Sequence, residues 1–158
     1  MSLSQLLPTL AIIPDTIVFF EKASQKEVID ALFLSVLEFL QGLDTEKIKQ
    51  RILDREELSS TCIGAQIAIP HVKVEGLDRF ILSLGIHKEG VDWCSSDGMG
   101  VHLILLILGP DVEPIYYLNY LSSLTRRLKN HKLKDKLLSS QTAQEAFEIF
   151  KTEDESWI

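Results

Sequence analysis

The sequence predicts one α/β domain over residues 1–158, with a mixed central β-sheet flanked by helices on both faces. The chain has 158 residues, is 46% hydrophobic and 25% charged, and is large enough for one compact domain with a continuous core. The run Val101–Leu108 (VHLILLIL) is apolar on both faces, as expected of an interior strand that helices cover on each side. Capping boxes and helical periodicity before and after this run predict the covering helices.

Local signals give the order of the elements. Runs of β-branched, aromatic or aliphatic residues predict strands at Asp15–Phe20, Ile67–Ile69, Phe80–Ile86 and Val101–Leu108. The first helix has Ser24 and Glu27 as a capping box, apolar residues at helical spacing through Leu40, and a stop at Gly42. A second helix is expected to begin at Asp44 or Thr45 and to end between Arg55 and Leu58. A third should begin between Asp111 and Pro114 and end near Lys129. Two further helices are expected around Leu133–Leu138 and from Thr142 to Phe150.

Composition and charge argue against several functions. The net charge of −7 repels nucleic acid, so we expect no nucleic-acid partner. No stretch supplies the run of about 20 apolar residues that crosses a bilayer, so direct membrane insertion is not expected. The opening segment lacks the basic region of a signal peptide and contains Pro8, so we interpret it as part of the fold. Cys62 and Cys94 have no metal-binding spacing, which indicates reduced thiols in a cytoplasmic protein.

The segment Arg55–His71 (REELSSTCIGAQIAIPH) holds the candidate functional residues. Pro70 favours a strand end, which would set His71 at a sheet rim as a base, a metal ligand or a nucleophile toward phosphorus. The hydroxyl-rich loop Ser59–Thr61 and Gly64 could hold phosphate oxygens, and the planar guanidinium of Arg55 suits a phosphoryl dianion. Each residue also has a plainer interpretation. His71 could be a strand-end histidine whose ring bonds a nearby carbonyl, and Arg55 could be a solvated cation at a helix end.

The other histidines are weaker candidates. His87 precedes Lys-Glu-Gly and is expected in a surface turn. His102 is expected to be a core or rim histidine whose ring is hydrogen-bonded within the fold, and His131 to lie at a solvated helix end. No two histidines have the i, i+4 spacing of a helical zinc site, so we expect neither a metal nor a cofactor. The GxSxG, GxxxxGK[ST] and dinucleotide-binding patterns are all absent from the sequence.

Short motifs follow one another along most of the chain: Arg55-Glu56, Ser60-Thr61, Ile63-Gly64, Ala68–His71, Gly85-Ile86, Val91–Trp93, Asp97-Gly98 and the strand and turn Val101–Pro110. With these motifs the chain resembles the type-2 enzyme IIA domain of the bacterial phosphoenolpyruvate-dependent phosphotransferase system. That family comprises the fructose- and mannitol-class carriers and their nitrogen-regulatory relatives.

The resemblance implies a cytoplasmic phosphoryl carrier. His71 aligns with the histidine that accepts a phosphoryl group from a small phosphocarrier protein of the HPr kind, and Arg55 aligns with the arginine beside it. Transport members pass the group to a IIB domain and then to a sugar, whereas nitrogen-regulatory members act on a protein partner. A chain of this length without a IIB segment resembles the stand-alone regulatory type, and a separate transport subunit stays open.

The sequence departs from the family pattern at four positions. Tyr117 stands where the family commonly has a second histidine, and Cys62, Gln66 and Val72 stand where it often has glycine. A phenol can donate a hydrogen bond to phosphate, but it cannot carry a positive charge near neutral pH.

Two hypotheses therefore remain. In the first, the chain is a phosphocarrier with His71 as acceptor and with Thr61, Gly64 and Tyr117 as phosphate-binding residues. In the second, it is a degenerate module that regulates a partner without being phosphorylated. An apolar collar around His71, with Ile63, Ile69 and Val72 as candidates, could dock a carrier or a second copy of the chain, or these residues are ordinary core.

Overall fold

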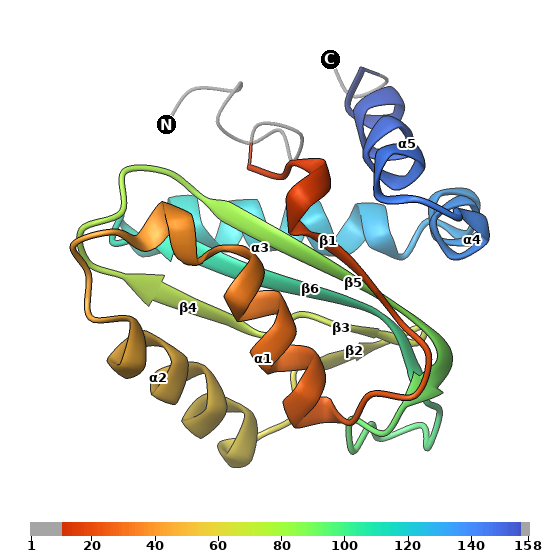
Figure 1. Ribbon diagram of the computed structural model, residues 1–158, viewed down its shortest axis with the longest axis horizontal. Coiled ribbons are helices and arrows are strands. Elements are labelled where there is room, and N and C mark those ends of the chain that lie inside the picture. The colour runs from red at the N-terminus through yellow and green to blue at the C-terminus, as the bar shows by residue number, and fades with distance from the viewer. Residues whose placement is uncertain (1–10, 156–158) are drawn as a thin grey trace.

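A mixed sheet of six strands lies between two layers of helices in the computed structural model, which describes residues 11–155 and the side chains of residues 11–152 (Figure 1). The strands are β1 (Ile17–Phe20), β2 (Cys62–Gly64), β3 (Ile67–Ala68), β4 (His71–Val74), β5 (Ile81–Val91) and β6 (Val101–Pro110). The helices are α1 (Gln25–Ser35), α2 (Thr45–Leu58), α3 (Pro114–Leu128), α4 (His131–Ser139) and α5 (Ala143–Glu155). The predicted α/β architecture is confirmed.

Strand β6 is the centre of the sheet. It runs antiparallel to β5 on one side, and parallel to β3 and then to β4 on the other. Strand β1 adds to β5 in parallel, and β2 adds to β3 in antiparallel orientation. Every residue of β6 except His102 is buried, as the two-sided apolar pattern of this run predicts.

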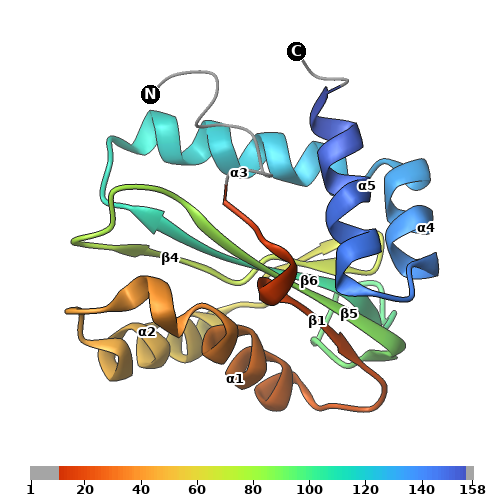
Figure 2. The same cartoon turned by 45° about the horizontal axis from the view of Figure 1, so that its top comes forward.

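Helices cover both faces of the sheet. Figure 2 shows α1 and α2 on one face, and α3, α4 and α5 on the other. Because successive strand residues point to opposite faces, β6 contributes to two cores. Leu103, Leu105 and Ile107 pack into the core on the side of α3–α5, and Ile104, Leu106 and Leu108 into the core on the side of α1 and α2.

Helix α1 begins as predicted and ends earlier than predicted. Ser24 accepts a hydrogen bond from the backbone N–H of Glu27, whose carboxylate accepts one from the N–H of Ser24. The helix stops at Ser35, and a separate 3-10 turn covers Leu37–Leu40. The hydroxyl of Ser35 lies 2.7 Å from the carbonyl oxygen of Leu32 and 2.7 Å from the hydroxyl of Ser83 in β5. This tertiary contact ties the helix end to the sheet, and local periodicity contains no sign of it.

Pro70 separates two strands that lie end to end along β6. Strand β3 ends at Ala68 and β4 begins at His71, while the carbonyl of Pro70 accepts a hydrogen bond of 2.9 Å from the N–H of Ile107. Pro70 thus interrupts the ladder, as a residue without an N–H must, but the chain continues in the sheet. His71 is therefore the first residue of a further strand and not the residue beyond the last one.

The described part of the opening segment, which starts at Ala11, packs against the rest of the fold. Ile12 is buried in the core, and the carbonyl of Ala11 accepts a hydrogen bond of 2.8 Å from the N–H of Leu82. The interpretation of residues 1–10 as part of the fold lies outside the described residues. Within residues 11–155, none of the helices combines the length and the apolar character that crossing a bilayer requires.

Candidate functional site

His71 is half-buried on β4, and one of its ring nitrogens is fixed by the backbone. Its Nδ1 lies 2.6 Å from the carbonyl oxygen of Ile69. Because a carbonyl oxygen can only accept, Nδ1 carries the ring proton and Nε2 keeps its lone pair. Nε2 has no hydrogen-bond partner among the described residues. The carbonyl-bonded histidine considered above is thus compatible with a nucleophile, because the bond occupies only one of the two nitrogens.

Tyr117 lies beside His71 on the face that α3 covers. The centroids of the two rings are 6.3 Å apart, and the ring of Tyr117 also packs on Phe80. A Cβ built on Gly109 would collide with Tyr117, so only glycine lets the ring lie this close to β6. The sequence prediction that Tyr117 belongs near the candidate histidine is thus met in the fold.

The hydroxyl of Tyr117 is buried without a hydrogen-bond partner. Burial raises the pKa of this phenol to about 12, while the positive charge of Arg51 acts in the opposite direction. The group is therefore a neutral hydroxyl near pH 7, able to donate one hydrogen bond.

Lys73 is a further cation at this site that sequence reasoning missed. Its Nζ lies 5.1 Å from the centroid of the Tyr117 ring and donates a hydrogen bond of 3.4 Å to the carbonyl of Val112. The signal that could have found it is the period-two spacing of His71 and Lys73, which puts both side chains on one face of β4.

Arg55 lies in the last turn of α2, where the sequence predicts it. Its Nη1 donates a hydrogen bond of 2.9 Å to the carbonyl of Ser59, which follows the helix. The contact closes the helix C-terminus, as a basic residue there commonly does. The predicted contact between Arg55 and a phosphoryl group on His71 stays a prediction.

Thr61 is buried in a hydrogen-bonded network behind the loop. Its N–H donates to Oε2 of Glu56 at 3.0 Å, and its hydroxyl donates to Oε1 of the same carboxylate. Nε1 of Trp93 also donates to Oε1, at 3.0 Å. Both donors of Thr61 are thus occupied, so its predicted contact with phosphate requires an exchange of these bonds. The network was not foreseen, because Glu56 and Trp93 are 37 residues apart.

The turn between β2 and β3 is strained. Gly64, Ala65 and Gln66 all have left-handed backbone conformations, with φ of +83°, +53° and +65°. Asparagine and glycine are the usual residues of such turns, so Ala65 and Gln66 carry a conformational cost. Gly64 has nothing within 4 Å of the position of a Cβ, so its backbone is open to approach.

Two of the three candidate collar residues are ordinary core. Ile69 and Val72 are both 7% exposed, and Ile63 is half-buried and packs against the core. The apolar side chains that do face outward near Tyr117 are Ile115 and Leu118 of α3, each 58% exposed. Ile69 and Val72 are therefore ordinary core residues and do not form an exposed collar around His71.

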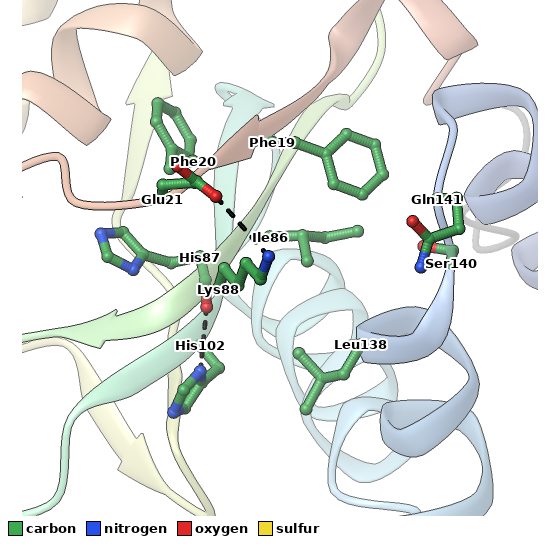
Figure 3. A pocket seen from close by; sticks show the side chains of 10 residues that line it. All are labelled: Phe19, Phe20, Glu21, Ile86, His87, Lys88, His102, Leu138, Ser140 and Gln141. Carbon is green, nitrogen blue, oxygen red and sulfur yellow. Dashed lines mark hydrogen bonds and ion pairs between the residues drawn. The ribbon is translucent and has the colours of Figure 1, made fainter.

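His87 and His102 line a different pocket of about 470 Å³, between the ends of β1 and β5 and the corner that joins α4 to α5 (Figure 3). The prediction that His87 lies in a surface turn is wrong. It is buried in β5, where its Nε2 donates to the carbonyl of Ala23 and its Nδ1 accepts from the N–H of Gly90. His102 is satisfied, as predicted, because its Nδ1 donates to the carbonyl of His87 at 2.9 Å.

This pocket is remote from His71. His71 pairs with Ile107 of β6, and His102 lies five residues earlier in the same strand. At about 3.3 Å per residue, the two histidines are roughly 16 Å apart along the strand. His131 is exposed at the start of α4, as expected for a solvated helix end. Of the four histidines, only His71 combines partial exposure with the unpaired ring nitrogen beside an orphan hydroxyl.

Known proteins with the same fold and similar sequence identify the family. The family model described as "Phosphoenolpyruvate-dependent sugar phosphotransferase system, EIIA 2" matches residues 11–153. The chain is 30% identical over 127 residues to a nitrogen regulatory protein of Pseudomonas aeruginosa, covering 80% of this chain and 82% of that protein. It is 33% identical over 135 residues to the fructose-specific EIIABC component of Bacillus subtilis, covering 85% of this chain but only 21% of that protein.

A solved structure agrees with this assignment. The nitrogen regulatory protein IIA-Ntr of Neisseria meningitidis superposes with a TM-score of 0.81 at 25% identity, covering 91% of this chain and 99% of that one. The match includes the mixed sheet and the helices on both of its faces. The chain therefore belongs to the EIIA type-2 family of the phosphoenolpyruvate-dependent sugar phosphotransferase system.

Proposed function

We propose that this protein is a cytoplasmic phosphoryl carrier, phosphorylated on Nε2 of His71 by a phosphocarrier protein of the HPr type. The observation that carries the proposal is the fixed ring of His71, whose Nδ1 is held by the carbonyl of Ile69 at 2.6 Å. The lone pair on Nε2 is thereby available without a change of tautomer.

The chemical step is a transfer between two imidazoles. The lone pair of Nε2 attacks the phosphorus of the carrier's phosphohistidine, and a new N–P bond forms as the old one breaks. The electron pair of the broken bond stays on the nitrogen of the carrier. Each ring keeps the proton on its other nitrogen, so no proton needs to move during the transfer. The catalytic demand is therefore positioning and charge stabilisation.

The phosphoryl oxygens need donors, and we propose Arg55, Gly64 and Tyr117 for this role. Arg55 provides a guanidinium that can exchange its bond to the Ser59 carbonyl for a bond to phosphate. The open backbone at Gly64 and the buried hydroxyl of Tyr117 are further candidates. We assign Thr61 the role of holding the loop in shape through Glu56.

A partner must bring its histidine to His71, and α3 offers a surface for it. Ile115 and Leu118 are one turn apart, each 58% exposed, on the helix that also carries Tyr117. Exposed apolar side chains beside a reactive group favour protein docking. We expect this surface to meet the donor carrier first and a downstream partner second.

We propose a nitrogen-regulatory type of role. The support is the coverage, since the chain matches 82% of the length of two nitrogen regulatory proteins and 99% of a solved IIA-Ntr chain. In such a role the phosphorylation state would control a protein partner. Delivery of the group to a IIB domain is the corresponding step of a transport subunit.

The second candidate is a binding module of the same fold that is never phosphorylated. The observation that favours it is Tyr117, a neutral residue where the family commonly has a second histidine. Incubation with phosphoenolpyruvate, enzyme I and HPr, followed by intact mass measurement, separates the two. We expect a gain of one phosphoryl group in the parent and in His102→Ala, and none in His71→Ala. An unmodified parent beside a phosphorylated control IIA would reject the carrier function.

A further inference from the structure

The contacts of the described residues do not explain why the hydroxyl of Tyr117 is buried. The residue is 6% exposed, and its oxygen has no hydrogen-bond partner in the described part of the protein. Phenylalanine would fill the same space without leaving a donor unpaired. A polar group kept at such a position indicates a partner that arrives from outside the chain.

Lys73 lies over the ring of Tyr117 and has donors that are not used in the fold. Its ammonium lies over the Tyr117 ring at 5.1 Å and makes one long hydrogen bond, 3.4 Å, to the Val112 carbonyl. An ammonium has three protons to donate. The ion pairs of the described residues involve Lys26, Lys49 and Lys88, and none involves Lys73. Lys73 is thus a half-buried cation that forms no ion pair with a carboxylate among the described side chains.

We propose that the Tyr117 hydroxyl and the Lys73 ammonium together bind the phosphoryl oxygens on Nε2 of His71, and so replace the second histidine of the family. The inference rests on the proposed function and adds to it two named donors. The hydroxyl supplies a neutral hydrogen bond, and the ammonium supplies the positive charge that a phenol lacks. Neither residue is a nucleophile; both act on the oxygens of the group being transferred.

The three residues come together for a simple structural reason. His71 and Lys73 are two residues apart on β4 and share one face, and the Tyr117 ring lies within reach of both, 6.3 Å from the His71 ring. Tyr117 thus has both the His71 ring and the Lys73 ammonium as neighbours, and this is the arrangement from which we infer that a phosphoryl group on Nε2 contacts both donors.

Single changes separate this role from a structural one. Tyr117→Phe removes one oxygen, and Lys73→Met keeps the length of the side chain without its charge. We expect each to slow phosphoryl transfer from the phosphorylated carrier by about tenfold or more, the effect of one lost hydrogen bond to a charged group. Lys73→Arg should restore most of the rate. Tyr117→Phe should melt at the same temperature as the parent or higher, which no structural role of the hydroxyl predicts.

Matched controls lie close by. Tyr116→Phe removes an exposed hydroxyl from the neighbouring residue of α3, and Lys132→Met removes an exposed charge from α4. Both should transfer at the rate of the parent. Equal transfer rates in the parent, Tyr117→Phe and Lys73→Met would overturn the inference and leave the carrier function intact.

A second measurement tests the donors independently of the carrier. Inorganic phosphate is titrated into the unphosphorylated protein while the ring resonances of His71 are followed by NMR, with sodium chloride at equal ionic strength as control. We expect a saturable shift in the parent that Tyr117→Phe and Lys73→Met weaken. If the parent is not phosphorylated by carriers but shows this shift, the proposed function fails and the anion site stands. A parent that shows no shift beyond the chloride control would overturn the anion site.

Discussion

The carbonyl oxygen of Ile69 lies 2.6 Å from Nδ1 of His71, two residues further along the chain. Pro70 between them cannot donate to the sheet, and β4 restarts at His71, so the ring folds back on its own backbone. The nitrogen that we propose as the nucleophile, Nε2, is thereby left unprotonated in the neutral ring before any partner arrives.

The first prediction concerns this tautomer. Long-range proton–nitrogen NMR at pH 8 should show His71 protonated on Nδ1 and unprotonated on Nε2, because only the Nδ1–H form satisfies the Ile69 carbonyl. His87 should show the opposite tautomer, since its Nδ1 accepts from Gly90 and its Nε2 donates to Ala23. Observation of the Nε2–H form for His71 would contradict the assigned nucleophile.

The second prediction concerns Glu56, which accepts hydrogen bonds from Thr61 and Trp93 behind the loop. Glu56→Gln places an NH₂ group opposite these donors and should reduce the free energy of unfolding by about 1–3 kcal/mol. Urea denaturation followed by tryptophan fluorescence measures the change. The neighbouring exposed Glu57→Gln is the matched control and should stay within about 0.5 kcal/mol of the parent. Equal losses in both variants would argue against a structural role for the network.

The third prediction concerns the strained turn at Ala65 and Gln66. Gln66→Gly should increase the free energy of unfolding by about 1 kcal/mol, because glycine adopts a φ of +65° without steric cost. Gly64→Ala should have the opposite effect, although nothing lies within 4 Å of the new Cβ, since φ there is +83°. Thermal melts of both variants check the pair. Stabilisation by Gly64→Ala would show that backbone strain does not govern this turn.

The fourth prediction concerns pH. Burial raises the pKa of Tyr117 to about 12 in the folded protein, against about 10 for an exposed phenol. The folded state therefore holds this proton more tightly than the unfolded state. Its contribution to stability is complete below pH 10 and is lost as pH rises from 10 to 12. Urea unfolding at a series of alkaline pH values should show this loss in the parent and a smaller loss in Tyr117→Phe. Identical pH profiles would contradict the burial of the phenol.

Elements with strong local signals were predictable from the sequence. The unbroken apolar run of β6, the Ser24 capping box of α1 and the start of α3 after Asp111 all lie close to where the sequence puts them. Element boundaries that depend on residues distant in the sequence were not predictable. Helix α1 ends at Ser35, whose hydroxyl contacts that of Ser83 in β5. Strand β2 lies within a polar loop and pairs with β3.

The candidate site shows the same division. The proximity of Tyr117 to His71 could be predicted, because the family pattern has a second histidine at the position of Tyr117. His87 was misplaced, since Lys88, Glu89 and Gly90 look like a surface turn, while the structure has a register shift between Ile86 and Val91 that buries the imidazole. Glu56 and Trp93 meet only in the folded chain, so no local pattern predicts their bond.

The most direct test of the account is to identify the phosphorylated atom. The protein, labelled with nitrogen-15 in its histidines, is incubated with phosphoenolpyruvate, enzyme I and HPr and examined at alkaline pH by phosphorus–nitrogen NMR. We expect a single N–P coupling, to Nε2 of His71, absent in His71→Ala. A coupling to Nδ1 of His71, or to any other histidine, would contradict the proposed acceptor atom.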